Sequence, residues 1–287
     1  MTGTWKRVQR LDAERLIAAL NAEAGTGLRF EGYCSGGEVG AAYVCWPDGH
    51  LAVLTWLPRT GLREMRRGSL AVAEVLRRNG YPVPGLEFAA ETDGAIALVW
   101  ELLPGEPVRV MTPGLLEAAL VLNESQADAA PAGVPPVRLY LTSDGPGFCL
   151  HEPLRAHSDR TRRLERWAAE TGSRYPDFLA GDDAVHCDFT PANMLADSGR
   201  VTGVIDWDGA GRGDRRFDLV TFRFGMHALP PQAQVTERLD RLLDGLPPDV
   251  LEPAWAHMSL RMTDWIIRHY DDARLGHWLD LAEQRLA

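Results

Sequence analysis

The chain has 287 residues, of which 45% are hydrophobic and 24% are charged, values that are ordinary for a globular protein. Its net charge of −10 argues against a nucleic-acid partner, because no dense run of Lys and Arg opposes the repulsion of phosphates. We see neither a secretory leader nor a run of about 20 apolar residues, so we expect a cytoplasmic protein without membrane contacts. The 4 cysteines form no CxxC pair, which argues against structural zinc and against a disulfide framework.

The first hundred residues predict an antiparallel sheet with one helix inserted after its third strand. Asp12 can cap a short helix that runs to about Ala22. Segments rich in strand formers, separated by turns, predict five strands over Leu28–Tyr33, Val39–Trp46, Leu51–Leu57, Leu86–Glu91 and Ala95–Leu102. Apolar residues at helical spacing predict the inserted helix over Arg63–Asn79.

Beyond a predicted hinge at Pro104-Gly105 the pattern becomes mainly helical. We therefore expect an α+β fold with an N-terminal lobe over residues 1–103 and a C-terminal lobe over residues 104–287. In the second lobe we expect helices at Pro113–Asn123 and near 232–244, 250–270 and 272–286, a loop over 130–136, a small hairpin over 137–150, and a loop with two short strands over 184–208.

The segment 185–208 carries the most information about function. It places Asp188, Asn193 and Asp206 in close order between two apolar runs. Phosphoryl transfer requires an oriented acceptor hydroxyl and magnesium on the phosphate oxygens. A carboxylate such as Asp188 can accept the hydroxyl proton, and the oxygens of Asn193 and Asp206 suit Mg²⁺. The pattern predicts a phosphotransferase.

The same segment resembles a known family. His-x-Asp-x-x-x-x-Asn at 186–193, Ile-Asp-Trp-Asp at 205–208, Gly213-Asp214 and Asp218-Leu219 are similar to the aminoglycoside phosphotransferase and choline kinase-like family of small-molecule kinases, which have the two-lobe protein-kinase fold. The resemblance covers most of the chain and fades over about 107–180 and after about 225.

The resemblance implies a role for each matching residue. Asp188 would be the catalytic base, Asn193 and Asp206 the magnesium ligands, and His186 and Asp218 structural supports of the catalytic loop. ATP, or GTP in its place, would be the phosphate donor. The implied nucleotide contacts are the glycines over the phosphates and two hinge backbone groups: Gly36, Gly37, Gly40, the Glu101 carbonyl and the Leu103 amide.

The chain departs from the family pattern at three positions. Cys187 stands where glycine is usual between the His and the Asp, which suggests a slightly different loop. Thr55 stands where the third strand should carry a phosphate-binding lysine, and Leu70 where the following helix should carry its glutamate partner. Lys6, the only lysine, is too far upstream to substitute. We hypothesise that one of four arginines beyond the strand replaces the lysine, the alternative being a solvated helix face: Arg59, Arg63, Arg66 and Arg67.

Three kinds of function remain open from sequence. The first is a kinase for a hydroxyl of a small natural product such as an aminoglycoside-like antibiotic. The second is a Ser/Thr phosphotransferase acting on a ribosomal, lanthipeptide-like precursor peptide, and the third is a nucleotide-binding pseudokinase prompted by Thr55. Asp264, Asp271 and Asp272 are candidate substrate contacts, although solvated carboxylates at a helix end would give the same pattern.

Overall fold

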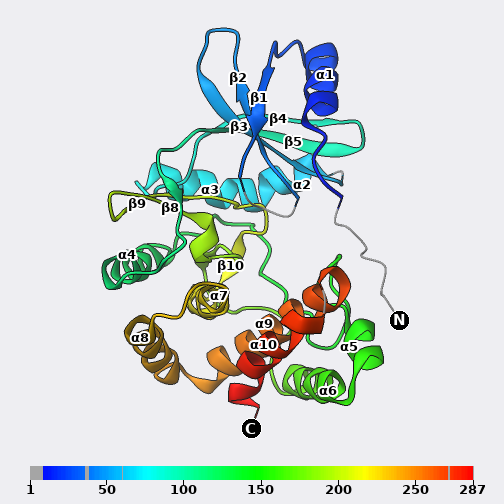
Figure 1. The fold of residues 1–287 in the computed structure, drawn as a ribbon, viewed down its shortest axis with the longest axis vertical. Coiled ribbons are helices and arrows are strands. Elements are labelled where there is room, and N and C mark those ends of the chain that lie inside the picture. The colour runs from blue at the N-terminus through cyan, green and yellow to red at the C-terminus, as the bar shows by residue number, and fades with distance from the viewer. Residues whose placement is uncertain (1–8, 36–38, 60, 271, 287) are drawn as a thin grey trace.

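The computed structural model describes residues 9–35, 39–59, 61–270 and 272–286. A sheet with flanking helices forms one end of the molecule and a mainly helical part forms the other (Figure 1). The predicted α+β class, with an antiparallel N-terminal sheet and a helical C-terminal part, is confirmed. None of the helices in these ranges combines the length and the apolar character that a bilayer crossing requires.

The N-terminal sheet is antiparallel, and its strands follow the order β1-β2-β3-β5-β4. The strands are β1 (Arg29–Tyr33), β2 (Ala42–Cys45), β3 (Leu51–Leu57), β4 (Leu86–Thr92) and β5 (Ala95–Glu101). All five were expected, but β2 begins later than the predicted Val39. Gly40 has φ 88°, a left-handed conformation that a regular strand does not use, so the chain enters the sheet only after it.

Helix α1 (Ala13–Ala24) covers one face of the sheet. The Asp12 side chain caps it by accepting a hydrogen bond from the Arg15 amide, and Gly25 ends it in a left-handed conformation. Leu16 and Leu20 bury their side chains in one cluster with Leu54 and Val99 of the sheet. The predicted first helix is confirmed.

The helix predicted over Arg63–Asn79 is wrong in one respect, because it is two helices. Helix α2 (Leu62–Arg67) and helix α3 (Ser69–Arg78) are separated by Gly68, whose φ −105° and ψ −108° no helix contains. A residue without Cβ tolerates this turn, whereas apolar periodicity continues across it. Leu70 and Met65 pack on the second face of the sheet with Ile96, Leu98 and Trp100.

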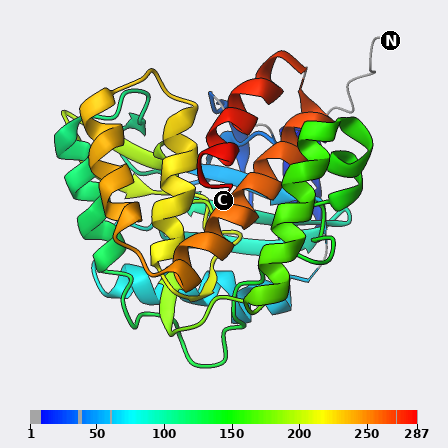
Figure 2. The same ribbon diagram turned by 90° about the horizontal axis from the view of Figure 1, so that it is seen from below.

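The helical part is built around one long helix. Its helices are α4 (Pro113–Glu124), α5 (His151–His157), α6 (Asp159–Arg174), α7 (Arg216–His227), α8 (Ala233–Asp244), α9 (Pro248–His269) and α10 (Asp272–Ala282). In Figure 2, α9 (orange) lies diagonally between α7 (yellow) and α6 (green), and all three bury apolar side chains in one cluster.

Two expectations for residues 137–174 and 216–227 need correction. The predicted hairpin over 137–150 does not form, since Arg138 bridges to Phe178 and Pro136 to Arg212 instead of pairing locally. Helices α5, α6 and α7 were not predicted. Their partners are distant in sequence, for example α9 for all three, so tertiary packing rather than a local signal determines them.

Short strands connect the two parts and present the central segment. Strand β6 (Glu106–Pro107) pairs with β8 (Met194–Asp197), which pairs with β9 (Arg200–Val204). Strand β7 (Asp183–Val185) pairs with β10 (Gly211–Gly213). The Val204 amide donates to the Pro82 carbonyl at 2.8 Å, and α3 shares a buried cluster with Phe189 and Trp207. The segment 185–208 therefore lies directly beneath α3.

Candidate active site

The backbone of the central segment brings Asn193 and Asp206 to the same end of a strand pair. Met194 of β8 pairs with Val204 of β9, and the Ile205 amide donates to the Asn193 carbonyl at 2.9 Å. Asn193 ends a short 3-10 turn, η1 (Pro191–Asn193), which joins the Asp188 loop to β8. The loop, the 3-10 turn and the end of β9 thus bring residues of one segment to one site.

Asp218, in the first turn of α7, holds the loop that carries Asp188. Its fully buried carboxylate accepts hydrogen bonds from the His186 amide (2.7 Å), the Cys187 amide (3.0 Å) and the Gln126 side chain (2.9 Å). Burial raises the pKa of Asp218 to about 7, and the three hydrogen bonds oppose the rise. Removing this carboxylate would leave buried donors unpaired, which costs about 1–3 kcal/mol per group.

His186 is a buried structural side chain in this geometry. Its Nδ1 accepts a hydrogen bond from the Asp188 amide at 3.2 Å, so Nε2 carries the proton and donates to the Ile205 carbonyl at 2.9 Å. Its ring packs against Trp207 with centroids 4.3 Å apart. Burial lowers the pKa of His186 to about 4, so it stays neutral and links the two halves of the segment.

Asp188 is held from two sides and remains partly open, with 36% of its side chain exposed. The Asn193 amide nitrogen donates to the Asp188 Oδ2 atom at 2.8 Å and to its carbonyl at 2.9 Å. From α9, Arg261 donates through Nη2 to Oδ1 at 3.0 Å. The sequence analysis missed Arg261, because its contact depends on how α9 packs beneath the loop and no motif marks it.

Cys187 occupies a strained backbone position next to Asp188. Its φ of 68° lies in the left-handed region, which glycine adopts far more readily than cysteine. The loop therefore accepts the side chain without leaving a glycine-like conformation. Burial raises the pKa of the half-buried Cys187 thiol, so the thiol stays protonated at neutral pH.

Asp206 and Asp208 form an acidic pair beside Asn193. Burial in the cleft, together with the charges of Asp208 and Asp188, raises the pKa of Asp206. The Asp206 side chain is nonetheless exposed to water, so we ascribe this upward shift to the neighbouring carboxylates more than to desolvation. Burial likewise raises the pKa of Asp208, while the positive charge of Arg59 opposes the rise.

The oxygens of Asn193 and Asp206 are of the type that Mg²⁺ accepts as ligands. The Asn193 side-chain nitrogen is occupied by Asp188, which leaves its oxygen as the free ligand beside the under-compensated carboxylates. Among the described residues no group of three or more His, Cys, Asp or Glu side chains is placed to hold a metal ion. An open site with few protein oxygens is what Mg²⁺ uses when a phosphate supplies other ligands.

The positions of the missing lysine and glutamate are filled by a different arrangement. The Trp100 indole nitrogen donates to the Thr55 hydroxyl at 3.1 Å, and Thr55 pairs with Leu98 in the sheet. Leu70 is 6% exposed and belongs to the apolar cluster with Leu98 and Trp100. These two positions therefore hold a hydrogen bond and apolar packing, where the resemblance implies an ion pair.

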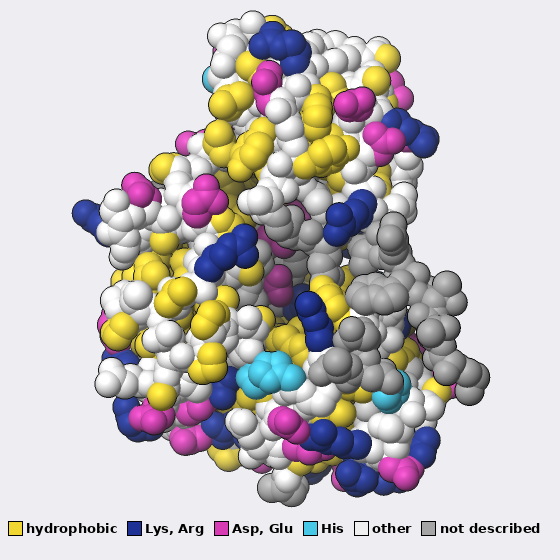
Figure 3. All heavy atoms as spheres, viewed as in Figure 1, with side chains coloured by type: hydrophobic (Ala, Val, Ile, Leu, Met, Phe, Trp, Pro, Cys, Tyr) yellow, Lys and Arg dark blue, Asp and Glu magenta, His cyan; other side chains and the backbone are white. Residues whose placement is uncertain are grey.

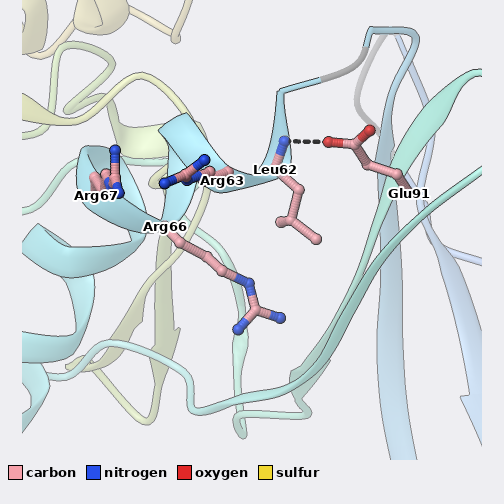
Figure 4. A pocket seen from close by; sticks show the side chains of 5 residues that line it. All are labelled: Leu62, Arg63, Arg66, Arg67 and Glu91. Carbon is pink, nitrogen blue, oxygen red and sulfur yellow. Dashed lines mark hydrogen bonds between the residues drawn. The ribbon is translucent and has the colours of Figure 1, made fainter.

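The four arginines of the phosphate hypothesis lie in different surroundings. Arg63, Arg66 and Arg67 line a pocket of about 450 Å³ with Leu62 and Glu91 (Figure 4). Arg66 extends away from Arg63 and Arg67 and donates to the Ala89 carbonyl at 3.2 Å. Arg59 follows β3 with an exposed side chain, and its positive charge opposes the rise in the pKa of Asp208.

The predicted nucleotide and substrate contacts lie partly outside the described residues. Gly36, Gly37 and Asp271 lie outside the described residues, and the side chain of Asp272, at the start of α10, is not described either. The Glu101 carboxylate accepts a hydrogen bond from the Gly85 amide at 2.9 Å, and Leu103 packs over Gly203 beside the hinge. Asp264 is fully buried and bound to Arg268 and the Leu150 amide, so its carboxylate is already satisfied within the protein.

The surface between the two parts is hollowed. Figure 3 shows acidic side chains in the depth of this hollow, with basic side chains on either side of it.

Comparison with known proteins identifies the family. Residues 52–255, more than half of the chain, match the model of the phosphotransferase enzyme family. The chain belongs to this family. It is a phosphotransferase, and the family resemblance read from its motifs is confirmed. A search of curated proteins gave no match.

Solved structures share the fold of this phosphotransferase. A thermostable mutant of aminoglycoside phosphotransferase APH(4)-Ia, in ternary complex with AMP-PNP and hygromycin B, is 19% identical with a TM-score of 0.62, and the match covers 96% of this chain and 97% of that one. APH(3'')-Id from Streptomyces rimosus is 17% identical with a TM-score of 0.55, over 87% and 98% of the two chains. A putative fructosamine-3-kinase from Haemophilus somnus is 11% identical with a TM-score of 0.58, over 94% and 96%.

Proposed function

We propose that this phosphotransferase moves the γ-phosphoryl group of ATP to a hydroxyl of a small natural product. The juxtaposition of Asp188, Asn193 and Asp206 at the end of one strand pair carries this proposal. The neighbour solved with AMP-PNP and hygromycin B supports a nucleotide donor and a small-molecule acceptor. The lobes would divide at residues 103 and 104, with adenine at the hinge formed by the Glu101 carbonyl and the Leu103 amide.

Each residue has a role that its contacts support. Asp188 is partly exposed and can accept the hydrogen bond, and then the proton, of an acceptor hydroxyl. Asn193 orients that carboxylate through its amide nitrogen, and its oxygen would be a cation ligand together with Asp206. Mg²⁺, when bound there, would neutralise charge on the donor phosphates. Asp218 and His186 hold the loop, so the base is preorganised rather than mobile.

For the phosphate grip we infer Arg59 among the four candidate arginines. It lies four positions after Thr55, just beyond the end of β3, and its positive charge opposes the rise in the pKa of Asp208. Arg66, in contrast, is bound to the Ala89 carbonyl. A guanidinium can bind two phosphate oxygens at once, so an arginine at another position of the chain can replace a phosphate-binding lysine.

The acceptor side favours a substrate that does not depend on many positive charges. Arg261 places a positive charge beside Asp188. The carboxylate of Asp264 already accepts hydrogen bonds from Arg268 and the Leu150 amide. A screen with labelled ATP should compare polycationic aminoglycosides with neutral and acidic hydroxyl compounds and with Ser/Thr peptides. We expect Mg²⁺-dependent labelling of a small molecule. Labelling of peptides alone would replace this proposal with a peptide kinase, and no stabilisation by millimolar ATP or ADP would indicate a pseudokinase.

A further inference from the structure

We propose that Arg261 is a positioning residue that clamps the catalytic loop from α9 and thereby holds Asp188 ready for transfer. Its guanidinium donates through Nη1 to the Cys187 carbonyl at 2.6 Å and through Nη2 to the Asp188 carboxylate at 3.0 Å. One side chain therefore fixes a backbone group and a functional group of adjacent residues. This inference rests on the proposed phosphotransferase role of Asp188.

The clamp acts where the loop is strained. Cys187 has φ 68°, and a residue other than glycine in this region costs about 1–2 kcal/mol. Asp218 holds the Cys187 amide on one side, and Arg261 holds its carbonyl on the other. The peptide groups flanking the strained residue are thus fixed by two separate helices, α7 and α9. We infer that Arg261 allows cysteine to stand where the family uses glycine.

The side chain of Arg261 is well suited to this role. Only 26% of it is exposed, so its ion pair with Asp188 is less screened than a surface pair. The planar fork directs two N–H groups toward two acceptors in a fixed geometry, whereas a lysine ammonium is a compact charge on a flexible stem. Its helix is also anchored, since Trp255 donates to the Ala282 carbonyl at 3.0 Å and Asp264 accepts from the Leu150 amide at 3.1 Å. The guanidinium is therefore presented from a rigid support.

Kinetics of Mg²⁺-dependent ATP hydrolysis, with water as the acceptor, test the clamp on the full chain. We expect Arg261→Met to lower kcat by about 10- to 100-fold, the cost of misplacing a catalytic group by about 1 Å. KM for ATP should change little, because Arg261 acts through Asp188 and not on the nucleotide. Arg261→Lys should recover part of kcat. Arg238→Met, which breaks an exposed ion pair between Arg238 on α8 and Glu117 on α4, is the matched control and should behave as the unaltered protein.

A second substitution examines the strain directly. In the Arg261→Met background, Cys187→Gly should recover kcat by about 5-fold, which corresponds to about 1 kcal/mol of relieved backbone strain. The same change beside an intact Arg261 should alter kcat by much less. If Arg261→Met leaves kcat unchanged, or raises KM while sparing kcat, Arg261 does not position the base.

Thiol reactivity gives a readout that does not depend on turnover. In a Cys34→Ser background, which removes the other half-buried thiol, Cys187 should react slowly with a disulfide reagent. Arg261→Met should accelerate that reaction several-fold and Arg238→Met should not. Equal rates in all three proteins would overturn the clamp. If Arg261→Met accelerates the thiol reaction but Asp188→Asn still turns over ATP at the normal rate, Arg261 holds the loop and Asp188 is not the base.

Discussion

Trp100 donates its indole hydrogen bond to the Thr55 hydroxyl at 3.1 Å, at the position where a kinase-like fold is expected to carry a phosphate-binding lysine. Leu70, at the expected position of the partner glutamate, lies 6% exposed in the apolar cluster that includes Trp100. Both halves of the expected ion pair have therefore been replaced together by a packed arrangement. At Asp188, Asn193 and Asp206, in contrast, the chain has the residues that the resemblance implies.

Thr55→Lys should destabilise the protein instead of restoring an ancestral grip. The lysine would lie against an apolar cluster without an acidic partner and would remove the acceptor of the Trp100 indole, at a cost of about 1–3 kcal/mol. Urea unfolding measures this change, with Thr55→Ser, which keeps the hydroxyl, as its control. A Thr55→Lys protein of full stability and tighter ATP binding would show that the site merely lacks a lysine.

Arg59→Ala should weaken ATP binding more than the same change at Arg63, Arg66 or Arg67. We expect a loss of about 1.5–3 kcal/mol, the range for a hydrogen bond to a charged group, which is about 10- to 150-fold in Kd. Calorimetric titration with ATP and with adenosine separates a phosphate contact from a base contact, since adenosine affinity should not change. Unaltered ATP affinity in all four variants would rule out an arginine grip.

The buried His257 should make the stability of the protein pH-dependent. Burial lowers its pKa from 6.5 to about 4, and its Nδ1 lies 2.7 Å from the Leu139 carbonyl. Because the folded state binds this proton less readily than the unfolded state, the contribution is fully present above pH 6.5 and is lost as the pH falls toward 4.

His257→Asn keeps a donor for the Leu139 carbonyl but cannot titrate. The free energy of unfolding is measured with urea between about pH 4.5 and 6. We expect it to rise with pH in both proteins, and the slope to be smaller in His257→Asn by about 1.4 kcal/mol per pH unit. Identical slopes would mean that His257 takes up its proton equally well in both states.

Local sequence signals were sufficient for much of the fold. The strands of the first sheet were predicted, because alternating apolar residues and turn residues act over a few positions. The helix over Arg63–Asn79 was wrong at Gly68, where apolar spacing continues although the backbone turns. Helices α5, α6 and α7 were missed, and the hairpin over 137–150 was wrong, since their structure depends on contacts with α9 and with residues 178 and 212.

At the site too, local sequence signals predicted some features, whereas contacts between distant residues could not be predicted. The spacing of Asp188, Asn193 and Asp206 in one motif predicted that they would converge, and a short strand pair brings this about. Arg261 could not be predicted, because it reaches Asp188 over 73 positions of sequence through the packing of α9. The replacement of an ion pair by Thr55, Trp100 and Leu70 was visible as a departure, but only the structure shows the hydrogen bond that fills it.

The central claim, that Asp188 serves as the base of a phosphotransferase, is tested most directly by Asp188→Asn. Both side chains can accept from Arg261 through one oxygen, but the amide cannot take a proton from an acceptor hydroxyl. We expect transfer of labelled phosphate from ATP to fall by at least about 100-fold, the lower range of general-base contributions, while Mg²⁺-dependent ATP binding stays within a few-fold. Transfer at the normal rate in Asp188→Asn would contradict the account.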